Sequence, residues 1–332
     1  MKSTKIIFIL KLLGILFCHT LVFGQVKFNL EEEFNSRYQI KSWNANNYNF
    51  SNSVLSVIQS DVGHLWIGTF EGLYTFDGVN FKRVDKEKSH EHLFLNHTFW
   101  SILEDSQKNI WIGANGGGIV FYDSKEKKYK KNQDKKIQNE IIISLFEDSK
   151  GTIWAGTRKH LLKIQNQKVE IVHLKDFPSL AIRAFYEDKN GVLWLGTQDN
   201  GLLGIKNDEV VQAYTTQDGL LSNQVYSLFI DNQNTFWLGT TKGLCVLKNQ
   251  KITPLPLNAI KTNSSPVITS FFEDIDEHTL WIGTEEGLIH LKNNKQSFVA
   301  NLPDNRVTAI NKDKEGNIQK IVKEQEVDWK FN

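Results

Sequence analysis

The stretch from Glu147 to Thr157, EDSKGTIWAGT, contains the pattern that decides the fold. An acidic pair ends an apolar segment, a short turn containing glycine follows, and a tryptophan then stands between apolar residues, two positions before a second glycine. Six tryptophans stand between apolar residues in this way, two positions before a glycine, at spacings of 45, 43, 40, 43 and 44 residues: Trp66, Trp111, Trp154, Trp194, Trp237 and Trp281. A nearly constant period of this length indicates a repeat architecture in which each repeat is one supersecondary unit.

Each repeat has the sequence features of four short strands. Apolar runs of a few residues alternate with Gly, Asn and Asp, which favours strands joined by tight turns. Four antiparallel strands at this period describe one blade of a β-propeller. We therefore predict an all-β fold, a β-propeller of seven four-stranded blades. Its repeats are predicted to start near residues 54, 99, 141, 182, 225 and 268, with a degenerate seventh near residue 307.

The seventh repeat departs from the pattern. Gln319 stands where the tryptophan is expected, and the residues from 307 onward supply only three strands. We predict that the segment Tyr38–Trp43 provides the fourth strand, because closing the ring in this way removes exposed sheet edges. Six blades followed by a frayed tail is the alternative.

The constant residues of the repeat are predicted to be structural. A tryptophan buries roughly 150–250 Å² and can fill the wedge between two neighbouring blades, and the aspartate can accept hydrogen bonds from turn amides. The glycine after each tryptophan leaves room for a neighbouring chain to pack closely. These glycines are Gly68, Gly113, Gly156, Gly196, Gly239 and Gly283.

The first 24 residues resemble a secretory signal peptide. Lys2 and Lys5 precede the apolar run Ile6–Phe17, and the small residue Gly24 ends the segment. This order of charge, apolar run and small residue is that of an export signal, and the run is too short to span a bilayer. We predict a signal peptide at 1–24, a propeller at 25–332 and a secreted, periplasmic protein, with an uncleaved N-terminal anchor as the alternative.

Composition limits the remaining function classes. The chain has 332 residues and a net charge of +1, which argues against a nucleic-acid binder because such proteins concentrate basic residues. Signal cleavage would leave Cys245 as the sole cysteine, so we expect no intramolecular disulfide and a buried thiol at this position.

The consensus Glu-Asp-x-x-Gly-x-x-Trp-Ile-Gly-Thr-x-x-Gly-Leu resembles the two-component regulator propeller repeat. The first repeat matches the family over 66–81, and a second family phrase stands at 217–223. The resemblance implies the periplasmic sensor propeller of bacterial hybrid histidine kinases, which senses ligands, commonly glycans. It also implies an oligosaccharide ligand, with a histidine kinase or an envelope protein as partner. No kinase sequence or later membrane span follows in this chain, so we expect a receiving module without its own output.

Enzymatic and metal chemistry find little support in the sequence. A sialidase box needs aspartate and glycine two positions apart, whereas Asp148 and Gly151 are three apart, and the few arginines are scattered. His90 and His92 have no further ligand types in a recognisable pattern around them. We predict that the protein is not an enzyme and holds no metal or cofactor. A protein-interaction scaffold of the envelope and, less favoured, a propeller glycosidase are the alternatives to ligand sensing.

A ligand site is predicted on the face where the turns between second and third strands meet the connectors between blades. These turns mix aromatic, amide and charged groups, which suits hydrogen bonding to a sugar. Trp100 is an extra tryptophan on an innermost strand; core filling is its favoured interpretation, and stacking on a ligand at the channel mouth is the alternative that makes it a candidate ligand-binding residue. The other predicted ligand-binding residues are Phe70, Glu71, Asn115, Arg158, Lys159, Gln198, Asp199, Lys242 and Glu285.

Overall fold

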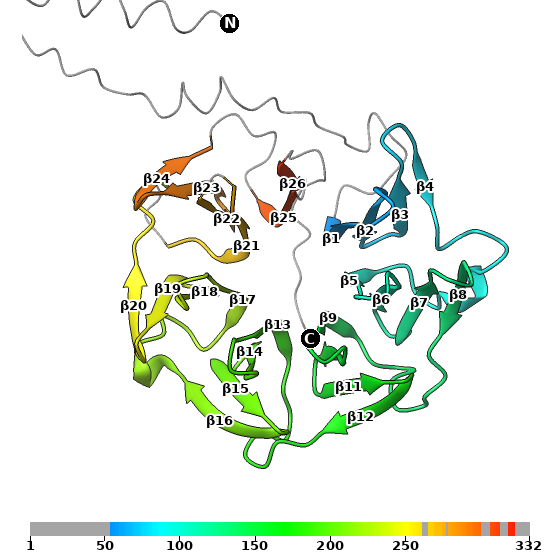
Figure 1. Ribbon diagram of the computed structural model, residues 1–332, viewed down its shortest axis with the longest axis horizontal. Helices are drawn as coiled ribbons and strands as arrows, with labels where there is room; N and C mark the ends of the chain where they lie inside the picture. Colours follow the sequence, from blue (N-terminus) through cyan, green and yellow to red (C-terminus); the bar gives the residue numbers. More distant parts are fainter. Residues whose placement is uncertain (1–53, 261–264, 277, 300–305, 313–317, 323–332) are drawn as a thin grey trace, which may run out of the picture. The chain divides into compact units, whose positions relative to one another are not determined.

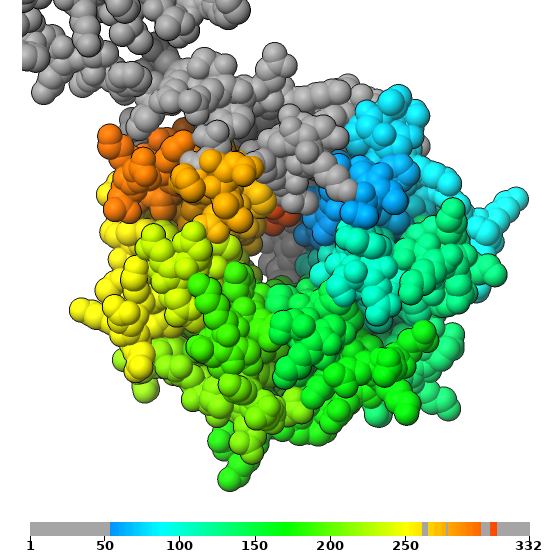
Figure 2. Space-filling model, viewed as in Figure 1, coloured from blue at the N-terminus to red at the C-terminus, as the bar shows by residue number. Residues whose placement is uncertain are grey.

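The computed structural model describes residues 54–260, 265–276, 278–299, 306–312 and 318–322. These residues form antiparallel sheets that stand side by side around a centre (Figures 1 and 2). In each sheet the first strand lies nearest the centre and the last lies outermost (Figure 1). The prediction of an all-β propeller is confirmed.

Six blades have four strands each, and the strands follow chain order from the centre outward. The first three blades comprise β1 (Val54–Gln59), β2 (Leu65–Thr69), β3 (Leu73–Phe76) and β4 (Phe81–Arg83); β5 (Phe99–Glu104), β6 (Ile110–Ala114), β7 (Ile119–Asp123) and β8 (Lys128–Lys131); and β9 (Ile142–Glu147), β10 (Ile153–Thr157), β11 (Leu161–Gln165) and β12 (Lys168–Val172).

The fourth to sixth blades repeat this arrangement. They comprise β13 (Ile182–Glu187), β14 (Leu193–Thr197), β15 (Leu202–Lys206) and β16 (Glu209–Tyr214); β17 (Val225–Ile230), β18 (Phe236–Thr240), β19 (Gly243–Lys248) and β20 (Lys251–Leu255); and β21 (Ile268–Asp274), β22 (Thr279–Thr284), β23 (Gly287–Lys292) and β24 (Lys295–Phe298). Two single-turn 3₁₀ helices, η1 (Glu91–Leu93) and η2 (Thr216–Asp218), lie in connectors. Within the described residues, we find no helix with the length and apolar character needed to cross a membrane.

The prediction of seven four-stranded blades is not supported. Between β21 and β1 lies a sheet of which the structure describes two strands, β25 (Val307–Lys312) and β26 (Ile318–Val322). Hydroxyl groups connect it to both neighbours, because Thr269 Oγ1 donates to the Val307 carbonyl and Thr308 Oγ1 donates to the Val54 carbonyl at 3.1 Å. The degenerate repeat lacks the tryptophan that supports the other blades. Both the predicted closing segment at 38–43 and the predicted signal peptide at 1–24 lie outside the described residues.

The repeated tryptophans fill the spaces between blades, as predicted. Trp154 on β10 is 6% exposed and packs with Phe185 and Leu195 of the following blade. Trp66, Trp111 and Trp194 likewise belong to clusters shared with the following blade. Because each core is shared between two sheets, a blade buries its apolar face only when its neighbour is present.

The aspartate that precedes the tryptophan has a larger role in four blades than the predicted turn cap. Asp148 Oδ1 accepts hydrogen bonds from the Lys150 and Thr152 amides, at 3.0 and 2.8 Å, and Oδ2 accepts the indole N–H of Trp154 at 2.9 Å. One carboxylate therefore fixes both the turn and the buried tryptophan. The same indole bond joins Asp105 to Trp111, Asp188 to Trp194 and Asp231 to Trp237.

The glutamate of the pair connects neighbouring blades. Glu147 accepts hydrogen bonds from both the amide and the hydroxyl of Ser106, each at 2.7 Å, in the turn of the preceding blade. Glu187 makes the equivalent bonds to Ser149, and Glu104 accepts the Asp61 amide. Repetition of the acidic pair is therefore explained by structure, since one acid holds its own blade and the other holds the blade before it.

The glycine of each tryptophan strand lies where a neighbouring strand approaches. A Cβ atom on Gly156 would come within 2.4 Å of Ser144 Oγ and 2.7 Å of the Ile182 carbonyl oxygen on the next blade. Gly68, Gly113, Gly196, Gly239 and Gly283 would each meet an atom at less than 3.0 Å in the same way. The prediction that these glycines permit close packing is confirmed.

Candidate ligand site in the central channel

Every innermost strand carries one extra residue at its second position. In β1, Val54 pairs with Thr69 and Ser56 pairs with Gly68, so Leu55 has no partner on β2. Such a β-bulge bends the strand and changes the direction of a side chain. The same register shift recurs in all seven described sheets, and the extra residues are Leu55, Trp100, Ile143, Arg183, Tyr226, Thr269 and Thr308.

The bulges separate constant residues from variable ones. The residue before each bulge is apolar and nearly or fully buried, as Phe99 and Ile182 show. The residue after it is serine or alanine in every innermost strand. Between these two constant positions, the bulged position changes chemical class from blade to blade, since it includes aliphatic, aromatic, hydroxyl and cationic side chains.

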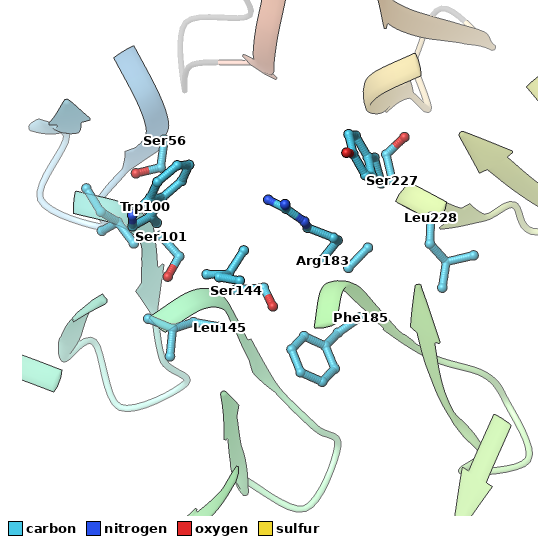
Figure 3. A pocket seen from close by; sticks show the side chains of 13 residues that line it. Ser56, Trp100, Ser101, Ser144, Leu145, Arg183, Phe185, Ser227 and Leu228 are labelled. Atoms are coloured by element: carbon cyan, nitrogen blue, oxygen red, sulfur yellow. The ribbon is translucent and has the colours of Figure 1, made fainter. Parts of the chain in front are cut away.

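Four bulged residues line a cavity at the centre of the propeller. The cavity has a volume of about 280 Å³ and is bounded by residues of β1, β5, β9, β13 and β17 (Figure 3). Trp100, Ile143, Arg183 and Tyr226 are the bulged members, and serines of neighbouring strands add hydroxyl groups to the wall. The cavity therefore combines apolar, aromatic and polar surface in the manner of small-molecule sites.

Arg183 is the one charged side chain in this lining. It extends from β13 into the open centre, toward the side on which Trp100 lies (Figure 3). Its Nε donates to Gln198 Oε1 at 2.8 Å, and its guanidinium carbon lies 5.1 Å from the centre of the Tyr226 ring. Burial lowers the pKa of the guanidinium, and the positive charge of Arg158 lowers it further. Tyr226 and Asp199 act in the opposite direction and raise this pKa.

Trp100 supplies an aromatic surface to the same cavity. Its ring meets that of Phe70 edge to face, with centroids 5.4 Å apart. This contact joins a bulged residue of the second blade to a turn residue of the first. The indole N–H of Trp100 is buried and makes no hydrogen bond to the described residues. The side chain is partly buried and belongs to the cavity wall.

The structure brings together only part of the predicted ligand site. Trp100 lines the cavity, Phe70 supports Trp100, and Gln198 orients Arg183. Glu285 instead forms an ion pair with Arg306 at 2.7 Å, and the Asn115 carbonyl accepts the side-chain amide of Asn96. The remaining predicted residues are exposed in turns and are absent from the cavity wall: Glu71, Arg158, Lys159, Asp199 and Lys242.

Sequence reasoning missed Arg183, Tyr226 and Ile143 as channel residues. Aligning the repeats on the serine or alanine of the first strand would have found them, because the preceding position is the variable one among constant neighbours. The register shift that turns this position inward depends on pairing with the second strand.

Other reactive groups have structural surroundings. Among the described residues, no group of three or more His, Cys, Asp or Glu side chains could hold a metal ion. Cys245 is buried in β19 as predicted, and burial raises the pKa of its thiol. Asp85, fully buried, accepts the Leu73 amide at 3.1 Å and Arg83 Nε at 3.0 Å, and it also contacts His97. These bonds fix the connector after β4.

Comparison with known proteins agrees with the repeat pattern. The family model of the two component regulator propeller matches residues 93–116, 136–159, 176–199 and 206–242. These segments are two-component regulator propeller repeats. The first three of them span the first two strands of the second, third and fourth blades, and so include the bulges at Trp100, Ile143 and Arg183.

Proteins with similar propellers belong to several systems. A histidine kinase of Formosa agariphila is 27% identical over 197 residues, covering 54% of this chain and 14% of the kinase. The extracellular domain of a hybrid two-component system from B. thetaiotaomicron superposes with a TM-score of 0.54 at 24% identity, over 80% of this chain and 44% of that one. A streptogramin B lyase superposes with a TM-score of 0.64 at 13% identity, over 82% and 91% of the two chains.

The similarities in sequence and in structure support different conclusions. The chain spans a small fraction of the histidine kinase and less than half of the B. thetaiotaomicron domain. The two solved structures, at low identity, establish the fold alone, and one fold hosts many functions. The regulator propeller repeats, in contrast, relate this chain to the propellers of two-component systems by sequence.

Proposed function

We propose that this chain is the ligand-sensing propeller of a two-component regulatory system and binds a small polar ligand, such as a glycan fragment, in its central channel. The supporting observation is the cavity of about 280 Å³, whose wall contains bulged residues of different chemical classes on an otherwise repeated scaffold. A binding site needs such local variation, whereas a purely structural channel does not.

The proposal includes export to the periplasm. The pattern of the first 24 residues supports it, as does the extracellular location of the similar B. thetaiotaomicron domain. A histidine kinase would then receive the signal.

Binding without turnover is the expected activity. General acid–base catalysis requires a group that can give or take a proton near the operating pH. Among the described residues that line the cavity, none has a carboxylate, histidine, cysteine or lysine side chain. The wall therefore orients a ligand by hydrogen bonds and aromatic contact.

The test uses an array of oligosaccharides from extracellular polysaccharides. We expect the purified protein to bind some members, the Trp100→Ala variant to lose at least about tenfold in affinity, and Val211→Ala on the outermost strand β16 to bind normally. Mass spectrometry should recover the bound sugar intact. Cleavage of the sugar would overturn the proposal in favour of an enzyme. Stoichiometric co-purification of an envelope protein without any glycan binding would favour a scaffold.

A further inference from the structure

We propose that the channel selects a single sugar ring that carries an oxyanion, with the carboxylate or sulfate held by Arg183 and the ring face held by Trp100. This inference rests on the proposed function and specifies the ligand of the same site. It follows from an unbalanced charge, from the orientation of the guanidinium, and from the size and aromatic wall of the cavity.

No contact ion pair balances the charge of Arg183 within the described structure, and Asp199 acts on it only at longer range. No carboxylate belongs to the cavity wall, and Arg183 forms no ion pair with any described residue. A cation taken partly out of water without a counter-charge is unfavourable. The lowered pKa of the guanidinium, caused chiefly by burial, reflects that condition. An anionic ligand would supply the missing charge.

The guanidinium is held in place by its neighbours. Gln198 accepts a hydrogen bond from Nε, Tyr226 lies under the guanidinium plane, and Gln198 Nε2 reaches the Tyr226 hydroxyl at 3.5 Å. The two terminal nitrogens make no hydrogen bond to the described residues, and the side chain points into the open centre (Figure 3). A planar pair of N–H donors matches the two oxygens of a carboxylate or sulfate.

The wall on the Trp100 side suits a flat ring. Trp100 is braced by Phe70, so its ring is held rigidly, and its indole N–H is an unused donor. The cavity of about 280 Å³ is slightly smaller than typical ligand pockets, which measure roughly 300–1,000 Å³. One ring with one anionic group fills such a space better than an extended oligosaccharide does.

A neutral sugar should bind less well to this cavity. It would leave the desolvated guanidinium without an anionic partner, and sites built around a polar group reject ligands that cannot satisfy it. We expect galacturonate to bind at least about tenfold more tightly than galactose, which corresponds to about 1.4 kcal/mol.

Calorimetric titration with galacturonate, galactose 6-sulfate and galactose tests the inference. The first two distinguish a carboxylate from a sulfate, and galactose is the neutral control. Arg183→Gln should abolish the preference for the anions, whereas Lys175→Gln, which removes a positive charge from an exposed connector, should retain it. The melting temperature of Arg183→Gln without ligand should fall only slightly, because the substitution removes one hydrogen bond and one ring contact but no ion pair.

The outcomes separate the inference from the proposed function. Equal binding of galactose and galacturonate, unchanged in Arg183→Gln, would overturn the inference and leave a ligand-sensing propeller. Failure of both anions to bind at millimolar concentration would also overturn it. If the wild-type protein bound no member of the oligosaccharide array, the proposed function itself would be overturned.

Discussion

At the residue scale, the two carboxylate oxygens of Asp148 make two different kinds of contact. Asp148 ends the first strand of its blade, caps the following turn, and holds the indole of Trp154. The two bonds from the turn amides of Lys150 and Thr152 are the usual role of an aspartate in a tight turn. The indole bond explains why a polar N–H can be buried between blades, since its donor is satisfied inside the same repeat.

Removing this carboxylate should destabilise the protein. We expect Asp148→Ala to lower the free energy of unfolding by about 3 kcal/mol, because it leaves the buried Trp154 indole N–H and two turn amides without their acceptor. Urea denaturation measures the change. Asp176→Ala, in an exposed connector, is the control and should stay within about 0.5 kcal/mol of wild type. Equal losses in the two variants would contradict the role assigned to Asp148.

At the element scale, the propeller depends on how closely the innermost strand of one blade approaches the second strand of the blade before it. The glycine after each tryptophan removes the side chain at the point of closest approach. Tight packing of this kind tolerates little added volume. A single methyl group is therefore a sufficient probe of the contact.

Gly156→Ala should weaken the contact between the third and fourth blades. Its Cβ would meet Ser144 Oγ at 2.4 Å and the Ile182 carbonyl oxygen at 2.7 Å, so we expect a loss of about 1–3 kcal/mol. Gly117→Ala is the matched control, because its Cβ would find its nearest neighbour at 3.6 Å. Thermal melting should place Gly156→Ala clearly below Gly117→Ala, and the reverse order would refute the packing argument.

The sequence predicts strands better than it predicts their register. Trp154, Gly156 and Asp148 could be assigned to structure because the same physical requirement recurs in each blade. The sequence of a single repeat could not place Arg183 in the channel, because its side chain is turned inward by a bulge in the pairing of two strands. Trp100 was recognisable as an unusual residue on an innermost strand. The exposed turn residues were predicted to bind ligand because they differ between repeats. Residues exposed to solvent can also differ freely, so this variation does not identify a binding site.

At the scale of the whole molecule, the ends of the ring meet through β25. Thr308 Oγ1 donates to the Val54 carbonyl across 254 positions of sequence. Val307 is fully buried beside the sixth blade, where its side chain lies against Gly283. Two described strands thus occupy the gap that the first and sixth blades would otherwise leave.

A charge at this junction should weaken the closed ring. We expect Val307→Asp to lose about 3–5 kcal/mol, because a buried carboxylate without a partner is strongly destabilising. Val79→Asp, in a turn where the valine is 75% exposed, should be nearly neutral. Guanidinium unfolding and limited proteolysis measure the two variants. If Val307→Asp were as stable and as protease-resistant as Val79→Asp, β25 would have no role in holding the ring.

The register shift at the second position of each innermost strand has a consequence for engineering. An extra residue has no cross-strand partner to match, so exchanging it need not alter the pairing of its sheet. Five of the seven positions, those of Leu55, Trp100, Ile143, Arg183 and Tyr226, can therefore be randomised together, whereas Thr269 and Thr308 keep the hydroxyl bonds that hold the seventh sheet. A library built at these sites would sample new recognition chemistry on one inherited scaffold, and duplication of a repeat followed by a single codon change could do the same in evolution.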